Sequence, residues 1–181
     1  MIVGQKNEIR RKDHVEGVET VPIPRSLAGY MKACGFPLDP TGVMQRLSGG
    51  LANQNYLLNL ETGPMVLRKA PGGTLPPGAH DMAREHRVLS RLHEVFPLAP
   101  RSHLLCEDRA VLGAPFHLID YRPGRVIRGA DLSPLSPVED LPRNLAAMLA
   151  ETMARLHGLE PRSCGLEGLG RPSGFVPRAV Q

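Results

Sequence analysis

Tryptophan is absent from this sequence of 181 residues, and the other aromatic residues are limited to three tyrosines and four phenylalanines. Proteins that bind nucleic acid by stacking its bases combine aromatic side chains with a basic groove. No basic run here is interleaved with aromatics, although the net charge is +4. We therefore expect no nucleic-acid partner. The hydrophobic content of 41% still suffices for a packed core, which must be mainly aliphatic.

Lysine is also scarce, because Lys6, Lys12, Lys32 and Lys69 are the only four in the chain. The positive charge therefore comes mainly from arginine, which makes bidentate contacts with phosphate and carboxylate groups. An anionic ligand is compatible with this composition. The arginines are also scattered among acidic residues, as on an ordinary solvated surface, so composition alone does not decide between the two.

The three cysteines, Cys34, Cys106 and Cys164, are too few and too far apart to indicate a disulfide framework or a metal site. This usage is typical of a reducing compartment. The sequence also lacks an apolar run of about 18 residues, the length that a membrane-spanning helix needs. Its N-terminus is charged where a signal peptide would be apolar. We expect a cytoplasmic protein without a membrane partner.

Five short runs of apolar residues, bounded by glycine, proline and polar turn residues, predict β-strands. They are residues 43–47, 55–60, 65–69, 103–106 and 116–120. The first three are joined by short connections, which favours an antiparallel meander. Val111-Leu112 is expected to extend the fourth strand after a turn.

Three segments have the apolar spacing of amphipathic helices. They are residues 24–34, 79–96 and 145–159. In the second, which is the clearest, Met82, Leu89, Leu92 and Phe96 form one stripe. This segment is predicted to be the main helix that packs on the sheet.

Glu85 lies on the same stripe of the second predicted helix, three residues after Met82. A carboxylate directed into a core needs a partner, because an unpaired buried charge is costly. The candidate partner is Arg68 or Lys69 on the third predicted strand. The alternative is that the helix lies at the rim of the fold, where Glu85 would reach solvent.

A glycine turn at residues 48–50 lies between the first two predicted strands. Backbone N–H groups approach a ligand closely at such a turn, because no side chain intervenes. A cation on the third strand would then meet phosphate charge. Side chains alternate along that strand, so Val66 and Arg68 share one face while Lys69 lies on the other.

The predicted order is helix, three strands, long helix, two strands, linker, helix and tail. This is the layout of a protein-kinase-like small lobe, an α+β fold with a five-stranded antiparallel sheet and one inserted long helix. The first helical part of a large lobe would follow. We expect a mobile N-terminal tail over residues 1–20, the kinase-like lobe over 21–122, and the hinge exit with an incomplete C-terminal lobe over 123–181.

Several motifs resemble those of the aminoglycoside phosphotransferase-like kinases. They are residues 47–56, 66–73, 84–89, 112–121 and 124–126. Their order and spacing are similar to one branch, whose domains occur alone in bacteria or fused ahead of acyl-CoA dehydrogenase domains. The resemblance covers about residues 24–175. It implies a phosphotransferase that uses ATP, with Mg²⁺ in the complete domain.

The resemblance implies phosphate-binding roles for the glycine turn and the third strand. The turn residues that would cover the ATP phosphates include Ser48, Gly49, Gly50 and Asn53. Arg68 would contact the α- and β-phosphates, with Lys69 as the fallback. Glu85 would be the helix carboxylate that pairs with this cation. Helical periodicity identifies Glu85 independently of the resemblance.

An adenine site is implied as well. Leu47 and Val66 would be its apolar walls. The hinge between the two lobes would be formed by Asp120, Tyr121 and Arg122, whose backbone groups would meet the adenine.

The sequence departs from the family pattern in two places. Ala52 stands where relatives usually carry a hydroxyl, which removes one possible phosphate contact. In addition, no histidine is followed by Gly-Asp or Arg-Asp, so the catalytic aspartate and the Mg²⁺ ligands are absent. The nearest imitation, at residues 157–160, closes a predicted helix, where His157 is expected to pack or cap. The chain is therefore expected to stop inside the family's domain and to contain no catalytic or metal-binding residue.

These observations predict the ATP-binding part of a small-molecule phosphotransferase that does not catalyse alone. The alternative is a non-catalytic nucleotide-binding or protein-interaction module. In that case the apolar face formed by Leu145, Leu149, Met153 and Leu156 would favour self-association or a partner chain. The phosphate acceptor is not identified by the sequence.

Overall fold

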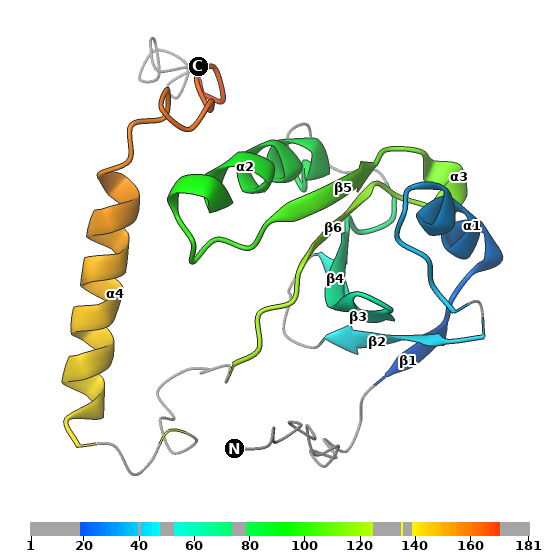
Figure 1. Ribbon diagram of the computed structural model, residues 1–181, viewed down its shortest axis with the longest axis horizontal. Coiled ribbons are helices and arrows are strands. Elements are labelled where there is room, and N and C mark those ends of the chain that lie inside the picture. Colours follow the sequence, from blue (N-terminus) through cyan, green and yellow to red (C-terminus); the bar gives the residue numbers. More distant parts are fainter. Residues whose placement is uncertain are drawn as a thin grey trace, which may run out of the picture.

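The computed structural model describes residues 19–39, 41–47, 53–73, 79–124, 135 and 139–170. These residues form a six-stranded sheet and four helices (Figure 1). The strands are β1 (Thr20–Pro22), β2 (Val43–Leu47), β3 (Gln54–Leu60), β4 (Gly63–Lys69), β5 (Ser102–Cys106) and β6 (Phe116–Asp120). The helices are α1 (Arg25–Ala33), α2 (Met82–Val95), α3 (Arg109–Leu112) and α4 (Leu141–His157). The strand order is β1-β2-β3-β4-β6-β5, and every neighbouring pair is antiparallel.

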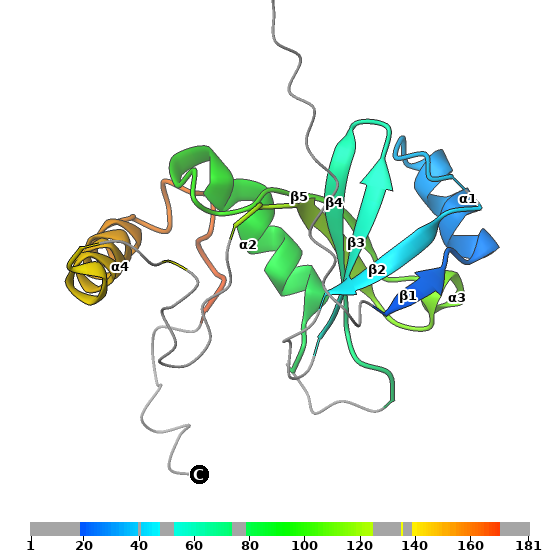
Figure 2. The same cartoon turned by 90° about the horizontal axis from the view of Figure 1, so that it is seen from below.

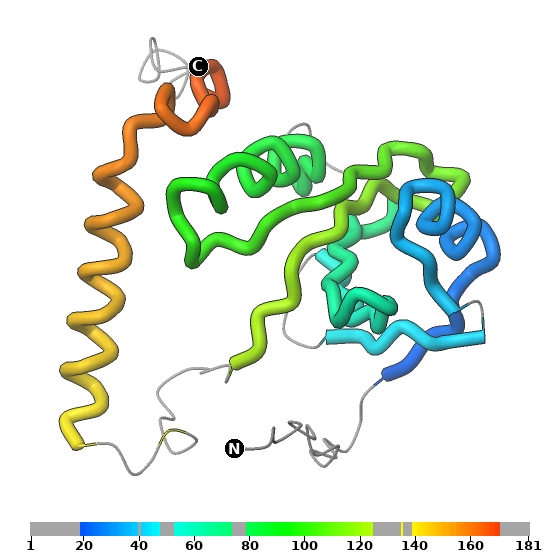
Figure 3. Tube along the Cα trace, in the orientation of Figure 1, coloured from blue at the N-terminus to red at the C-terminus, as the bar shows by residue number. Residues whose placement is uncertain are grey.

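The predicted meander is confirmed as β2-β3-β4, and its path can be followed in Figure 3. β2 and β6 have the predicted bounds, and the other three predicted strands begin one or two residues earlier. A two-residue turn joins β3 to β4, so that Leu60 pairs with Gly63. Gly63 has a φ of +119°, which side chains other than hydrogen rarely tolerate. The turn therefore depends on glycine at this position.

A sixth strand was not predicted, so the expected count of five is wrong by one. Thr20 pairs with Gln45 and Pro22 with Val43, which places β1 at the edge of the sheet beside β2. The strand has only three residues, which is too short to show an alternating pattern. It begins at the last residue of the predicted tail, and residues 1–18 of that tail lie outside the described residues.

The prediction that Val111-Leu112 extends a strand is also wrong, because these residues belong to the one-turn helix α3. The side chain of Asp108 caps this turn by accepting a hydrogen bond from the backbone N–H of Ala110 at 2.8 Å. Gly113 ends it with a φ of +79°. An aspartate before the turn and a glycine after it are helix signals that outweigh a two-residue apolar run.

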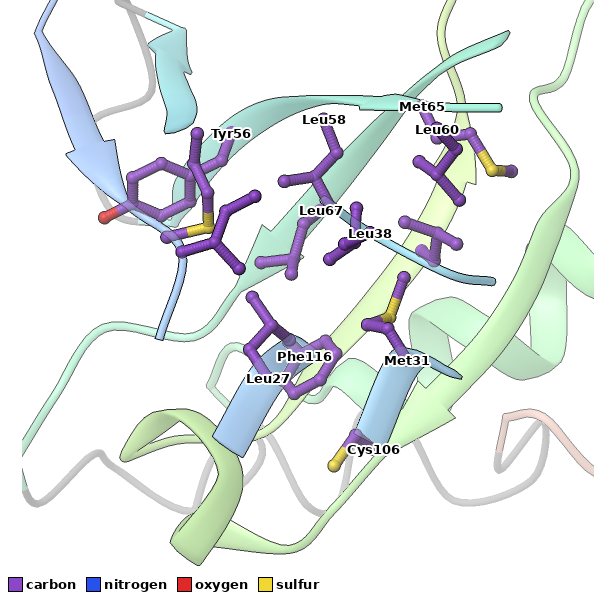
Figure 4. Close-up of a cluster of buried hydrophobic side chains, with 13 residues drawn as sticks. Leu27, Met31, Leu38, Tyr56, Leu58, Leu60, Met65, Leu67, Cys106 and Phe116 are labelled. Atoms are coloured by element: carbon purple, nitrogen blue, oxygen red, sulfur yellow. The ribbon is translucent and has the colours of Figure 1, made fainter. Parts of the chain in front are cut away.

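α1 and α2 lie on opposite faces of the sheet, as Figure 2 shows. The face toward α1 carries the main hydrophobic core, in which Leu27 and Met31 of α1 are fully buried. They pack against alternate side chains of the central strands, including Leu67 and Phe116 (Figure 4). Gly35 follows α1 with a φ of +84°, the left-handed conformation that glycine commonly adopts just after a helix.

α2 begins at Met82, three residues later than predicted, because the side chain of Asp81 accepts a hydrogen bond from the N–H of Arg84 and caps the helix there. α4 begins four residues earlier than predicted, at Leu141. It lies apart from the sheet, on the side of α2 (Figures 1 and 2). Within the described ranges, no helix combines the length and the apolarity needed to cross a bilayer.

Candidate functional site

The face of the sheet toward α2 carries a row of polar side chains across three strands. Arg68 on β4 is in register with Asn55 on β3 and with His117 on β6. In-register residues of adjacent strands point to the same face. The predicted orientation of Arg68 is therefore found, and it lies under the helix that carries Glu85.

Arg68 and Glu85 form an ion pair at the centre of this face. The Nε atom of Arg68 donates to Glu85 Oε2 at 2.6 Å, and its Nη2 atom lies 3.5 Å from Oε1. Both side chains are 31% exposed, so the pair is half-buried and accessible from solvent. Glu85 therefore has the partner that an inward-directed carboxylate needs, while it remains partly exposed to solvent.

Lys69 does not take part in this pair. Its Nζ atom donates instead to Gln54 Oε1 at 3.3 Å. The choice between Arg68 and Lys69 as the partner of Glu85, left open by the sequence, is therefore decided in favour of Arg68.

Two asparagines complete the surroundings of the pair. Asn55 Oδ1 accepts a hydrogen bond from Arg68 Nη1 at 3.2 Å, and Asn53 Nδ2 donates to Glu85 Oε1 at 3.4 Å. The Oδ1 atom of Asn53 is buried and has no hydrogen-bond partner among the described residues. Asn53 is thus beside the ion pair, at the entrance to β3. The other predicted turn residues, Ser48, Gly49 and Gly50, lie outside the described residues.

A buried histidine lies behind the pair and was not predicted. His117 is fully buried, and its Nε2 atom lies 3.4 Å from Glu85 Oε2. This contact is longer than a normal hydrogen bond, and His117 Nε2 has no hydrogen-bond partner among the described residues. On its other side, His117 Nδ1 lies 3.0 Å from the Oγ atom of buried Ser102, which in turn lies 2.8 Å from His86 Nδ1. Alternation along β6 places His117 on the face opposite Phe116 and Leu118, but nothing in the sequence indicates that it is buried beside Glu85.

The charges around Glu85 stabilise its ionised form. The neighbouring His117 and the Arg68 guanidinium lower the pKa of the Glu85 carboxyl to about 2, against the opposing effect of partial burial. Burial lowers the pKa of His86, and the proximity of His117 adds to that shift. Glu85 is therefore a carboxylate at any physiological pH, as an anchor for a cation must be.

Two side chains of the predicted hinge, those of Asp120 and Arg122, are bound to other parts of the protein. Asp120 accepts hydrogen bonds from His103 Nε2 at 2.7 Å and from the backbone N–H of Arg101 at 2.9 Å. Partial burial would raise the pKa of Asp120, but these donors and nearby Arg122 lower it below its ordinary value. Arg122 Nη2 also donates to the carbonyl oxygens of Pro97 and Ala99. The segment that follows β6 is therefore tied to the loop between α2 and β5.

Val66 and Leu47, the predicted apolar walls, occupy different environments. Val66 lies on the same face as Arg68 and is 9% exposed, whereas Leu47 ends β2 and is partly exposed. A hollow of about 260 Å³ borders Glu85 and is lined by Val88, Leu89 and Leu169. A larger hollow of about 420 Å³ lies at the start of α2, and neither Arg68 nor Glu85 lines it.

The segment after α4 is attached to the outer side of α2. Arg87 Nη2 donates to the carbonyl oxygen of Glu167 at 2.8 Å, and Arg91 Nη1 donates to that of Gly165 at 3.1 Å. Backbone acceptors have no sequence signal, so these contacts could not be predicted. α2, the helix that carries Glu85, therefore contacts the sheet on one side and the segment after α4 on the other.

The described residues contain no group of three or more His, Cys, Asp and Glu side chains that could hold a metal ion. His157 is exposed at the last residue of α4, in accord with a helix-end position.

Comparison with known proteins identifies longer relatives that match this chain over part of their own length. Acyl-CoA dehydrogenase family member 11 of Gallus gallus is 37% identical over 160 residues, which cover 86% of this chain and 20% of that protein. Acyl-CoA dehydrogenase family member 10 of Mus musculus is 31% identical over 166 residues, which cover 90% of this chain and 15% of that protein. The chain thus spans about a fifth or less of the length of these relatives.

A solved structure shares the fold. It comes from Ralstonia eutropha, is provisionally described as an aminoglycoside phosphotransferase, and matches with a TM-score of 0.64 at 23% identity. The match covers 86% of this chain and 44% of that chain. The α+β, kinase-like architecture expected from the sequence is therefore confirmed, with six strands in the sheet.

The sequence profile of the phosphotransferase enzyme family matches residues 43–181. Because this match covers most of the sequence, the chain belongs to the phosphotransferase enzyme family.

Proposed function

We propose that this chain binds the phosphates of ATP through Arg68, as the nucleotide-binding part of a small-molecule phosphotransferase. The observation that carries the proposal is the 2.6 Å contact between Arg68 Nε and Glu85 Oε2 on the open face of the sheet. A guanidinium held by a carboxylate keeps a fixed direction, so less conformational entropy is lost when an anion binds. Family membership supports the same activity.

The geometry leaves part of the guanidinium for a ligand. Glu85 accepts a hydrogen bond from Nε and lies 3.5 Å from Nη2, while Asn55 accepts a hydrogen bond from Nη1. Arginine has five N–H donors, so donors remain for phosphate oxygens. The pair is also 31% exposed, which allows an anion to approach. Asn53, whose buried Oδ1 has no partner among the described residues, lies beside the ion pair that the anion would approach.

Phosphate transfer itself is not proposed for this chain alone. No histidine of the sequence is followed by Gly-Asp or Arg-Asp, the pattern that supplies the catalytic aspartate in such kinases. Mg²⁺ would neutralise phosphate charge when it accompanies ATP. The proposed activity is therefore nucleotide binding.

Calorimetric titration of the full chain with ATP and with adenosine, each with and without Mg²⁺, tests the proposal. Arg68→Ala is expected to weaken ATP binding roughly 10- to 100-fold, the usual range for one charge-assisted contact, and to leave adenosine binding unchanged. Lys69→Ala is the matched control, because it removes the neighbouring cation on the opposite face. Equal losses in both variants, or no ATP binding by the native chain, would contradict the proposal.

A second candidate function is protein interaction through α4. Its exposed apolar residues are Met148, Leu149, Met153 and Leu156, at 59%, 60%, 47% and 38% exposure. A contiguous apolar face on a helix surface favours association. Light scattering across a concentration series would detect a dimer, which Leu149→Asp should dissociate and Ala147→Asp, on another side of the helix, should not. A native chain that remains monomeric at high concentration would exclude self-association.

A further inference from the structure

We propose that His117 is a positioning residue, which together with Ser102 holds the Glu85 carboxylate in the orientation that anchors Arg68. The inference deepens the proposed function and rests on it for the role of Arg68 toward phosphate. Its own basis is a chain of polar contacts that begins and ends on α2 and passes through two strands of the sheet.

The contacts form a continuous chain up to its last step, where His117 Nε2 faces Glu85 Oε2 but has no hydrogen-bond partner among the described residues. His86 Nδ1 lies 2.8 Å from Ser102 Oγ, Ser102 Oγ lies 3.0 Å from His117 Nδ1, and His117 Nε2 lies 3.4 Å from Glu85 Oε2. Ser102 is 3% exposed and His117 is fully buried. Buried polar groups of this kind are costly unless they are paired. The buried Nε2 atom of His117 therefore needs an acceptor, and Glu85 Oε2 is the carboxylate oxygen beside it.

The proton positions follow from the need to satisfy every group. His117 must present Nε2–H to the carboxylate, which leaves Nδ1 as an acceptor when the ring is neutral. The hydroxyl of Ser102 then donates to Nδ1, and its oxygen accepts from Nδ1–H of His86. Every donor in the chain points toward Glu85, and hydrogen bonds aligned in this way strengthen one another.

Three polar groups from different parts of the sheet lie around the Glu85 carboxylate. Arg68 approaches from β4, His117 from β6 and Asn53 from the entrance to β3. His86, on the same helix as Glu85, acts only through Ser102. Without His117, Oε2 would retain a single donor, and a carboxylate that is 31% exposed could turn toward water. Arg68 would then lose its fixed direction.

Two conservative variants distinguish the contact made by His117 Nε2 from the contact made by His117 Nδ1. The amide of Gln reaches the place of Nε2, so His117→Gln keeps a donor toward Glu85. The amide of Asn reaches only the place of Nδ1, so His117→Asn keeps the contact with Ser102 and loses the one with Glu85. Carbon-detected NMR titration of the Glu85 carboxyl in the full chain reads the contact directly, without any ligand. The affinities for ATP and adenosine measure the effect of this contact on phosphate binding.

We expect His117→Asn to raise the Glu85 pKa from about 2 toward its ordinary value and to weaken ATP binding about 3- to 10-fold, the range of one modest hydrogen bond, without affecting adenosine. His117→Gln should restore both readouts. Ser102→Ala, which leaves the imidazole in place, should give an intermediate shift and provides the same test if the Asn variant does not fold.

An unchanged Glu85 pKa in both His117→Asn and Ser102→Ala would overturn the inference. Equal weakening of ATP and adenosine by His117→Asn would also overturn it, because that result reflects a structural role alone. A native chain that binds no ATP overturns the proposed function. The titration of Glu85 needs no ligand, so it tests the role of His117 independently of that result.

Discussion

Strands β4 and β6 present apolar side chains to α1 and polar side chains to α2. On the first face Leu67, Phe116 and Leu118 are fully buried. On the second, the residues next to them in sequence, Arg68 and His117, form a polar network under Glu85. Neighbouring residues of these strands thus lie in opposite environments, because side chains alternate along a strand. The α2 face is not wholly polar, since the buried Val66 also lies on it.

The difference separates stability from ligand binding. Burial of large apolar side chains on the α1 face contributes most of the favourable free energy of folding. A half-exposed ion pair on the α2 face contributes little, since exposed pairs are worth about 0–1 kcal/mol. Changes on the first face should therefore unfold the lobe, and changes on the second should alter binding in a folded protein.

The largest expected effect is on the α1 face. Phe116→Ala removes a fully buried ring that also meets Tyr30 edge to face at 6.0 Å. It should lower the free energy of unfolding by about 3–5 kcal/mol, as measured by urea denaturation. Val43→Ala, at a position that is 52% exposed, is the control and should change it by less than about 0.5 kcal/mol. A loss below about 1.5 kcal/mol for Phe116→Ala would mean that this face does not carry the stability.

On the α2 face, Glu85→Gln should weaken ATP binding about tenfold while changing stability by no more than about 1 kcal/mol. The amide keeps the shape of the side chain but removes the charge that orients Arg68. Combined with Arg68→Ala, its effect on ATP affinity should be much less than additive, because both changes disrupt one unit. Additive losses in a double-mutant cycle would show that the two residues act independently.

Acid should act through the same carboxylate. The pKa of Glu85 in the folded protein, about 2, lies below its ordinary value of 4.5. Its ionisation therefore stabilises the fold fully above pH 4.5, and this contribution is lost as the pH falls toward 2. The difference in unfolding free energy between the native chain and Glu85→Gln should shrink over that interval. A difference that stays constant from pH 5 to pH 2.5 would contradict the assigned cause.

The smallest effect is expected outside the sheet. Leu149 on α4 is 60% exposed, so Leu149→Ala should change the unfolding free energy by less than about 0.5 kcal/mol. This measurement sharpens the comparison, because the same leucine-to-alanine change at Leu27 should cost about 2–5 kcal/mol. A large loss at Leu149 would show that α4 packs against a partner in solution.

Much of the fold was predictable because it depends on local patterns. Short apolar runs between turns predicted five strands within two residues, and the spacing around Met82 predicted α2 together with the inward orientation of Glu85. β1 and α3 were missed because three or four residues carry too little periodicity. The roles assigned to Ser48, Gly49 and Gly50, and to the backbone of the hinge, stay predictions.

The sequence by itself determined the alternation that separates the two faces of the sheet and the helical spacing that places Glu85 on the inner side of α2. Only the tertiary structure decided that Arg68, and not Lys69, meets Glu85, and that His117, Ser102 and His86 connect behind it. The reason is distance along the chain. Periodicity reports the direction of a side chain within its own element, whereas a contact among residues of α2, β4, β5 and β6 exists only after those elements have packed.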